Sequence, residues 1–110
     1  MPPSSDQAAL TERIDALLAV DRGSSDPFLT MLERTLTDGY ACALALEAER
    51  WRLERRIGEV AAQLQEGNRE LKAQELVLLS ERHADAGAEL TALRDRLAAL
   101  RDRIALVKAA

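Results

Sequence analysis

Cysteine, proline and aromatic residues are all scarce in this chain of 110 residues. Cys42 is the single cysteine, so no disulfide can form within the chain and no cysteine cage can hold a metal. The three prolines lie at positions 2, 3 and 27, which leaves the remaining sequence free to form long helices. With one Phe, one Tyr and one Trp in a composition that is 47% apolar, the core must be built from aliphatic side chains.

Long apolar runs are missing too. No run reaches the roughly 18 apolar residues that a transmembrane helix needs, and the first residues lack the basic and apolar regions of a signal peptide. We therefore expect a cytoplasmic protein without a membrane segment. The bias towards Ala, Arg and Leu is typical of a GC-rich bacterial genome.

No segment carries a strong charge of one sign. The formal net charge is −4, divided as −3 over residues 1–26, −2 over residues 27–67 and +1 over residues 68–110. Such a mild gradient produces no strong field for nucleic acid or for an anionic membrane.

The strongest pattern is an apolar row near the end of the chain, at alternating steps of three and four residues. Its members are Leu90, Leu93, Leu97, Leu100, Ile104 and Val107. This spacing is typical of a coiled-coil seam and predicts that a second helix lies against it. A matching row runs from Leu29 to Leu64, after Asp26 and Pro27, which predict an N-cap followed by a proline in the first turn.

Gly67 and Asn68 predict a turn between the two rows, because glycine can end a helix and asparagine can begin one. Continuing the first row beyond Leu64 meets few apolar residues, whereas restarting it one residue later selects Leu76 and leads into Leu90. A slip of one residue rotates a helix face by about 100°, which a straight helix cannot absorb. The alternative is one continuous helix with an internal glycine.

These features predict an all-α fold with two parts. Residues 27–110 form an antiparallel two-helix coiled-coil hairpin with its turn near 67–68. Residues 1–26 form a short helix, at about residues 6–20, and a loop in which Gly23 ends that helix.

Two registers of the hairpin remain open. Folding tightly at residues 67–68 sets Leu46 against Leu90 and Leu53 against His83. Sliding by one heptad improves the pairing of flanking charges, for example Glu47 with Arg94, but needs a longer loop. Because exposed ion pairs contribute only about 0.2 to 1 kcal/mol each, we favour the tight turn.

The hairpin seam alone is a small core. Ordering the backbone of some 80 residues costs about 1 to 2 kcal/mol of conformational entropy per residue. This cost favours further burial of apolar side chains against a second surface. We therefore expect a homodimer, assembled as a dimeric helical bundle, or an obligate partner.

Tyr40, Leu44 and Trp51 fall beside the first seam and widen its apolar face. Something besides the partner helix of the hairpin should cover them. One interpretation is that the N-terminal helix does so; the other is that a second chain or another protein does. Trp51 is the strongest candidate for a contact anchor, because tryptophan is enriched among interface hot spots.

Arg50 and His83 are polar residues on the seams. His83 is expected in an apolar layer opposite Leu53, either as a pH-sensitive joint or as a tolerated residue reached by water. Arg50 either fixes the register or lays its stem on the core with its head in water. Cys42 is expected to act as a small buried hydrophobe.

The sequence offers no catalytic, cofactor or metal site. His83 has Leu79 and Gly87 one turn away on either side, so no second ligand accompanies it. We expect a non-catalytic interaction module, an adaptor, regulator or chaperone, that binds a protein partner through Tyr40, Leu44 and Trp51. The alternative is a nucleic-acid-associated protein that uses arginines such as Arg52 and Arg55, although the interleaved acids make this less favourable.

Overall fold

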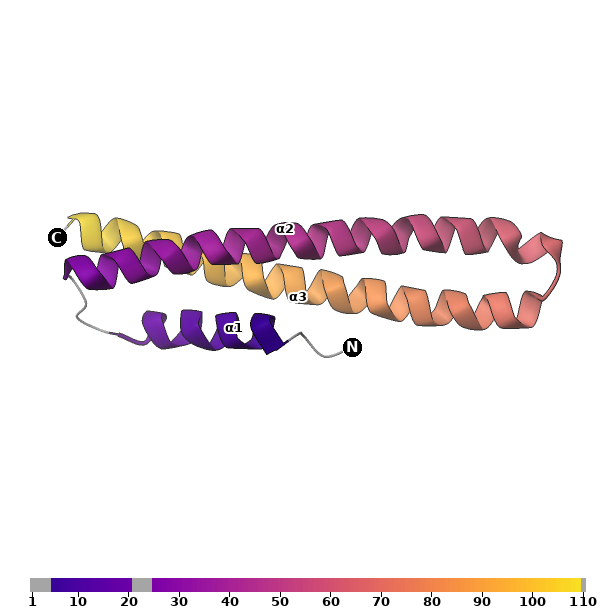
Figure 1. Ribbon diagram of the computed structural model, residues 1–110, viewed down its shortest axis with the longest axis horizontal. Helices are drawn as coiled ribbons and strands as arrows, with labels where there is room; N and C mark the ends of the chain where they lie inside the picture. Colours follow the sequence, from indigo (N-terminus) through magenta and orange to yellow (C-terminus); the bar gives the residue numbers. More distant parts are fainter. Residues whose placement is uncertain (1–4, 21–24, 110) are drawn as a thin grey trace.

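The computed structural model describes residues 5–20 and 25–109 and shows three helices with no strand among them. Helix α1 spans Ser5–Leu18, α2 spans Asp26–Gln63 and α3 spans Arg69–Ala109, with a single 3₁₀ turn, η1, at Leu64–Glu66. The predicted all-α class is confirmed. Figure 1 shows α2 and α3 side by side in opposite directions, with α1 alongside their open end. The rod measures 64 × 19 × 16 Å.

The start of α2 is set by Ser25, one residue before the predicted cap. The Ser25 hydroxyl accepts a hydrogen bond from the Phe28 amide at 3.3 Å, which satisfies one of the free amides of the first turn. Asp26 is therefore the first helical residue and not the cap. Pro27 lies in the first turn, where its missing amide hydrogen is not needed.

The chain reverses at Gly67 and Asn68, whose φ angles are +115° and +53°. Both values lie in the left-handed region, which glycine and asparagine tolerate best. Lys72 then ties the two helices together, because its amine donates to the Gln63 carbonyl at 2.8 Å and its amide donates to the Asn68 carbonyl at 3.0 Å. The last turn of α2 thus gains a partner for a free carbonyl.

Buried side chains gather in two clusters along the rod. The open-end core joins all three helices and consists of Leu10, Ile14, Leu32, Ala43, Leu46, Leu90, Leu93, Leu97, Leu100 and Ile104. The turn-end core is much smaller and consists of Leu53, Val60 and Leu79, with Ile57 and Leu76 packed against them. Polar residues separate the two: Arg50 beside Gly87, and His83 beside Glu54.

Helix α1 packs along the open half of the hairpin and runs parallel to α3. Arg13 pairs with Asp38 at 2.5 Å, Asp15 pairs with Arg96 at 3.0 Å, and the Gln7 amide donates to Glu89 at 3.3 Å. The helix ends at Leu18, two residues earlier than predicted. The predicted cap at Gly23 lies outside the described residues.

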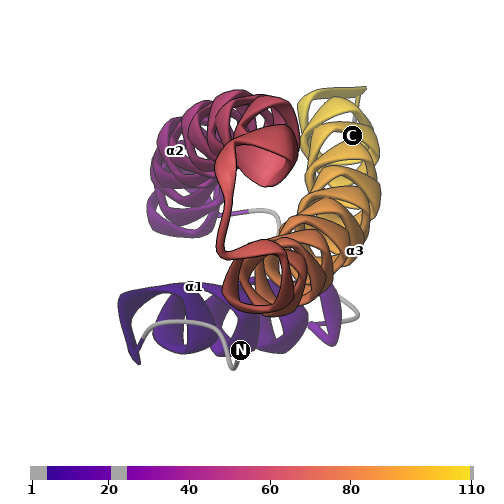
Figure 2. The ribbon, with the colours of Figure 1, turned by 90° about the vertical axis from the view of Figure 1, so that its right-hand side faces the viewer.

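Contacts across the hairpin follow the tight-turn alignment to within one residue. Arg50 lies against Gly87, and Glu54 pairs with His83 at 2.9 Å. The pair Glu47 and Arg94, expected of the shifted register, forms here as well, because the long side chains reach along the groove. End-on, α2 and α3 wind around each other while α1 lies to one side (Figure 2).

Candidate protein-binding face

Tyr40, Leu44 and Trp51 share one face of α2, because their spacing of four and seven residues is close to one and two helical turns. Their exposed fractions are 42%, 67% and 74%. Nothing in the described chain covers them. Trp51 is therefore a large apolar side chain held in water, which is uncommon unless another surface binds it.

Helix α1 lies on the opposite side of the seam from these residues. It packs near Ala41 and Cys42 and is held there by its ion pairs with Asp38 and Arg96. The expectation that the N-terminal helix covers Trp51 is wrong. The physical reason is that Leu10 and Ile14 complete the open-end core from the other groove of the hairpin.

Two hollows join to form a groove between α2 and α3 on the Trp51 side, which we call the Trp51 groove. One hollow, of about 500 Å³, is lined by Leu44, Glu47, Ala48, Arg50, Trp51, Glu54 and Arg94. The other, of about 460 Å³, is lined by Tyr40, Ala43, Leu44, Glu47, Arg94, Leu97 and Arg101. They share Leu44, Glu47 and Arg94, so the groove is continuous.

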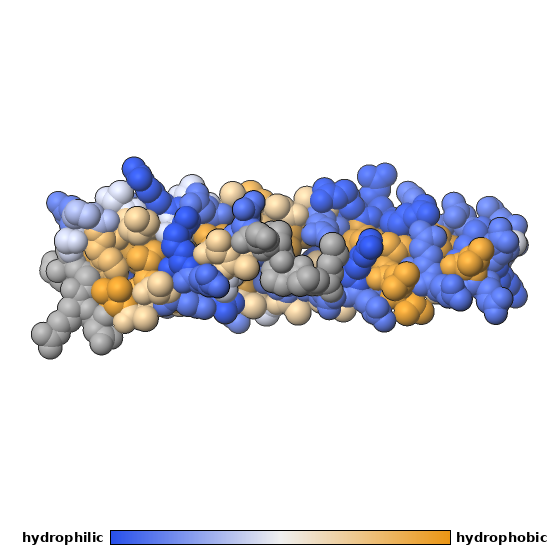
Figure 3. Space-filling view, turned by 60° about the horizontal axis from the view of Figure 1, so that its bottom comes forward, coloured by the Kyte–Doolittle hydropathy of each residue, from blue (hydrophilic) through white to orange (hydrophobic). Residues whose placement is uncertain are grey.

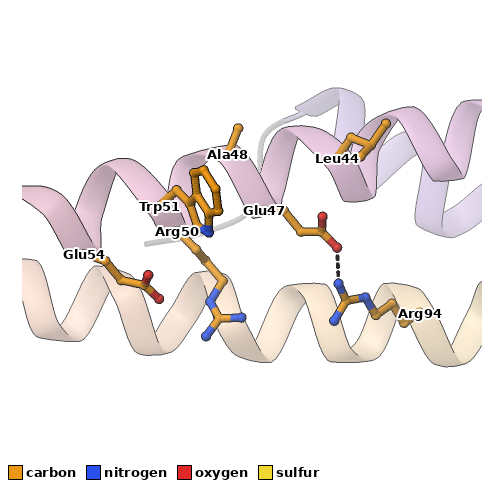
Figure 4. A pocket seen from close by; sticks show the side chains of 7 residues that line it. All are labelled: Leu44, Glu47, Ala48, Arg50, Trp51, Glu54 and Arg94. Atoms are coloured by element: carbon orange, nitrogen blue, oxygen red, sulfur yellow. Dashed lines mark hydrogen bonds and ion pairs between the residues drawn. The ribbon is translucent and has the colours of Figure 1, made fainter.

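Figure 4 shows how the side chains of the first hollow are oriented. The Trp51 indole points away from α3, while the Arg50 side chain extends towards α3. An ion pair between Glu47 and Arg94 bridges the two helices across the groove. The groove thus has a polar floor and an apolar rim on α2.

Arg50 is half-buried, and its Nε is enclosed without a hydrogen-bond partner. The guanidinium lies where α3 has Gly87, and a Cβ at that position would be 3.6 Å from Nε. The head of Arg50 is therefore held between the helices and does not extend freely into water. A buried donor without an acceptor costs about 1 to 3 kcal/mol.

His83 is not enclosed in an apolar layer, and its partial exposure agrees with the interpretation of a seam residue reached by water. Its Nε2 is 2.9 Å from Glu54 Oε1, and 28% of its side chain is exposed. The relative rotation of the helices moves the ring from the seam to its edge, where Glu54 can reach it. Glu54 was missed because it follows the seam residue Leu53 and shows no motif of its own.

Cys42 is a free, half-buried cysteine that packs against the open-end core, as expected of a small hydrophobe. Burial raises the pKa of its thiol, and the negative charge of Glu89 raises it further. Across residues 5–20 and 25–109, no group of three His, Cys, Asp or Glu side chains is arranged to hold a metal ion.

No protein-family model matches the chain, and neither the curated proteins nor the solved structures include a match. Of the helices in the described part, none combines the length and apolar character needed to cross a membrane.

Proposed function

We propose that the protein is a non-catalytic helical interaction module that binds a helix of a partner protein in the Trp51 groove. One observation carries the proposal: Leu44 and Trp51 are 67% and 74% exposed beside a groove that α1 leaves open. An adaptor, a regulator or a chaperone would each use such a surface. The free thiol of Cys42 suits a reducing compartment, so the proposal includes a cytoplasmic setting.

Helix α1 supports this proposal because it demonstrates how the hairpin accepts a third helix. It fits between α2 and α3 with Leu10 and Ile14 in the core and ion pairs at its edges. The Trp51 groove is the equivalent space on the other side of the hairpin. A partner helix would bury its apolar residues there in the same manner.

We assign no catalytic role to the charged groups of the groove. Glu47 is occupied by Arg94, and Glu54 is occupied by His83. Elsewhere on α2 the arginines are interleaved with acids, so the hairpin has no continuous basic track for a phosphate backbone. Protein binding is therefore favoured over the nucleic-acid alternative.

We also propose that the protein is a homodimer, joined through its turn half. Leu71 and Leu78 are 66% and 60% exposed there, beside the small turn-end core. They are spaced by whole helical turns from Glu89 and Arg96, which contact α1, so they continue the face that α1 covers. Figure 3, viewed from the α1 side, shows apolar surface remaining among hydrophilic side chains towards the turn.

A photocrosslinking amino acid at Leu44, introduced in the native host, tests the binding proposal. We expect a discrete crosslinked protein that disappears when Trp51→Ala is added. The matched control places the same crosslinker at Val77, which is 57% exposed on α3 and outside the groove. Equal crosslinking at both positions, or a product removed by nuclease, would reject the Trp51 groove as a protein-binding site.

A further inference from the structure

The charges of the Trp51 groove do not balance. Its acids are both engaged, Glu47 with Arg94 and Glu54 with His83. Two arginines of its lining, Arg50 and Arg101, have no acidic partner in the part of the chain that the structure describes. The groove therefore offers unpaired cations beside an exposed apolar rim.

The two unpaired arginines stand at opposite ends of the groove. Arg50 lies against Gly87 of α3, and Arg101 is fourteen residues further along that helix. At a rise of 1.5 Å per residue the separation is about 21 Å. This is the length of a helix of fourteen residues, the size of α1, which fills the opposite groove. Tyr40, Leu44 and Trp51 lie along α2 beside this span.

We propose that the occupant of the Trp51 groove is an acidic amphipathic helix of about four turns from another protein. Its apolar side chains would contact Leu44 and Trp51, and carboxylates near its two ends would pair with Arg50 and Arg101. The guanidinium of Arg50, which lines the groove, would gain a carboxylate as its ion-pair partner. This inference rests on the proposed function and specifies the chemistry of the partner.

The interactions of α1 provide the precedent for this chemistry. Residues 5–18 carry Asp6, Glu12 and Asp15 against Arg13, and Asp15 pairs with Arg96 of α3. An acidic amphipathic helix is thus what the hairpin already binds on its other side. Because α1 of each copy is used within its own chain, the second such helix comes from a different protein.

Two synthetic fourteen-residue helical peptides test the inference with the full-length protein. They share leucines at positions i, i+4 and i+7 and differ only in carrying Glu or Lys at the flanking positions. Binding is followed by the fluorescence of Trp51, the single tryptophan. We expect the Glu peptide to bind at least about tenfold more tightly than the Lys peptide, which corresponds to about 1.4 kcal/mol.

Charge reversal in the protein completes the test. Arg101→Glu should weaken the Glu peptide and strengthen the Lys peptide, whereas Arg103→Glu, the same change outside the groove lining, should leave the preference intact. Equal binding of both peptides would overturn the preference for an acidic helix but would still support the binding of a helix in the Trp51 groove. Binding of neither, with crosslinking at Leu44 still observed, would overturn the inference and leave the proposed function in place.

Discussion

At the scale of single residues, two glycines of α2 occupy opposite environments. A Cβ on Gly39 would overlap the Leu97 side chain, because Cδ2 would be too close for two non-bonded carbon atoms and Cγ would be at 3.4 Å. The absence of a side chain at Gly39 therefore leaves the space that Leu97 of α3 occupies in the open-end core. A Cβ on Gly58 would meet no atom within 4 Å beyond its own stretch of helix, so no packing contact requires a glycine there.

Alanine substitutions at these glycines should change stability in opposite directions. Gly39→Ala should destabilise the protein by about 1 to 3 kcal/mol, because Leu97 must leave its position. Gly58→Ala should stabilise it by about 0.5 to 1 kcal/mol, since alanine is the better helix former. Urea denaturation monitored by circular dichroism measures both. Stabilisation by both substitutions would contradict the close approach at Gly39.

Cys42 should react slowly with thiol reagents in the folded protein. Burial raises the pKa of its thiol, so less thiolate is present at a given pH than in the unfolded chain. We expect alkylation to be slower than in urea and its rate to rise at a higher pH. A folded-state rate equal to the rate in urea would argue against burial of the thiol.

The same raised pKa links Cys42 to stability. The folded chain holds the thiol proton more tightly than the unfolded chain does. The contribution of Cys42 to folding stability is therefore complete below the pKa that its thiol has in the unfolded chain. This stabilisation is lost as the pH rises through the pKa that the thiol has in the folded chain. Stability should therefore decline on the alkaline side, and a Cys42→Ala variant should lose that part of the decline.

Individual residues were predictable where only their own helix mattered. The position of Pro27 in a first turn and the apolar row from Leu90 follow from local rules. The pairing of His83 with Glu54 did not, because it depends on how far α3 is rotated against α2. A difference of one residue in that alignment moves the ring from the seam to its edge.

At the scale of the elements, α1 could be predicted as a helix but not placed. Its apolar face, with Leu10 and Ile14, suits either groove of the hairpin. The ion pairs with Asp38 and Arg96 favour one side, and both partners are distant in sequence. This is why the expected cover of Trp51 was wrong.

Ile14→Ala should detach α1 more effectively than the loss of an ion pair. Ile14 is fully buried, and removing such a side chain costs about 2 to 5 kcal/mol. Arg13→Ala, which removes the exposed pair with Asp38, should cost about 1 kcal/mol or less. Thermal denaturation compares the two variants. A larger loss for Arg13→Ala would mean that charge, and not burial, holds α1 in place.

At the scale of the whole molecule, the open-end core is much larger than the turn-end core, and this difference is relevant to how copies of the protein could associate. The open end has three helices around ten buried side chains in the described chain, whereas the turn end has two helices around three. The helical periodicity predicted the all-α class because both seams are long and regular. Oligomeric state depends on an intermolecular surface that periodicity does not define, so the homodimer stays a prediction.

Leu78→Asp should convert the dimer to a monomer. The substitution places a charge on the exposed face formed with Leu71, where burial against a second copy would then be costly. Val77→Asp is the matched control, since Val77 is similarly exposed but lies about 100° around the helix. Sedimentation equilibrium distinguishes the species. A monomeric wild-type protein, or equal effects of the two substitutions, would contradict dimerisation through this face.

Helix α1 covers one groove of the hairpin, and we infer that the Trp51 groove stays open for a partner. The fluorescence of Trp51 in the purified full-length protein, with acrylamide as quencher, measures this directly because no other tryptophan contributes. With 74% of the residue exposed, we predict the emission maximum of a water-exposed indole and efficient quenching. A blue-shifted emission protected from acrylamide would show that the chain, or a second copy of it, already covers this face.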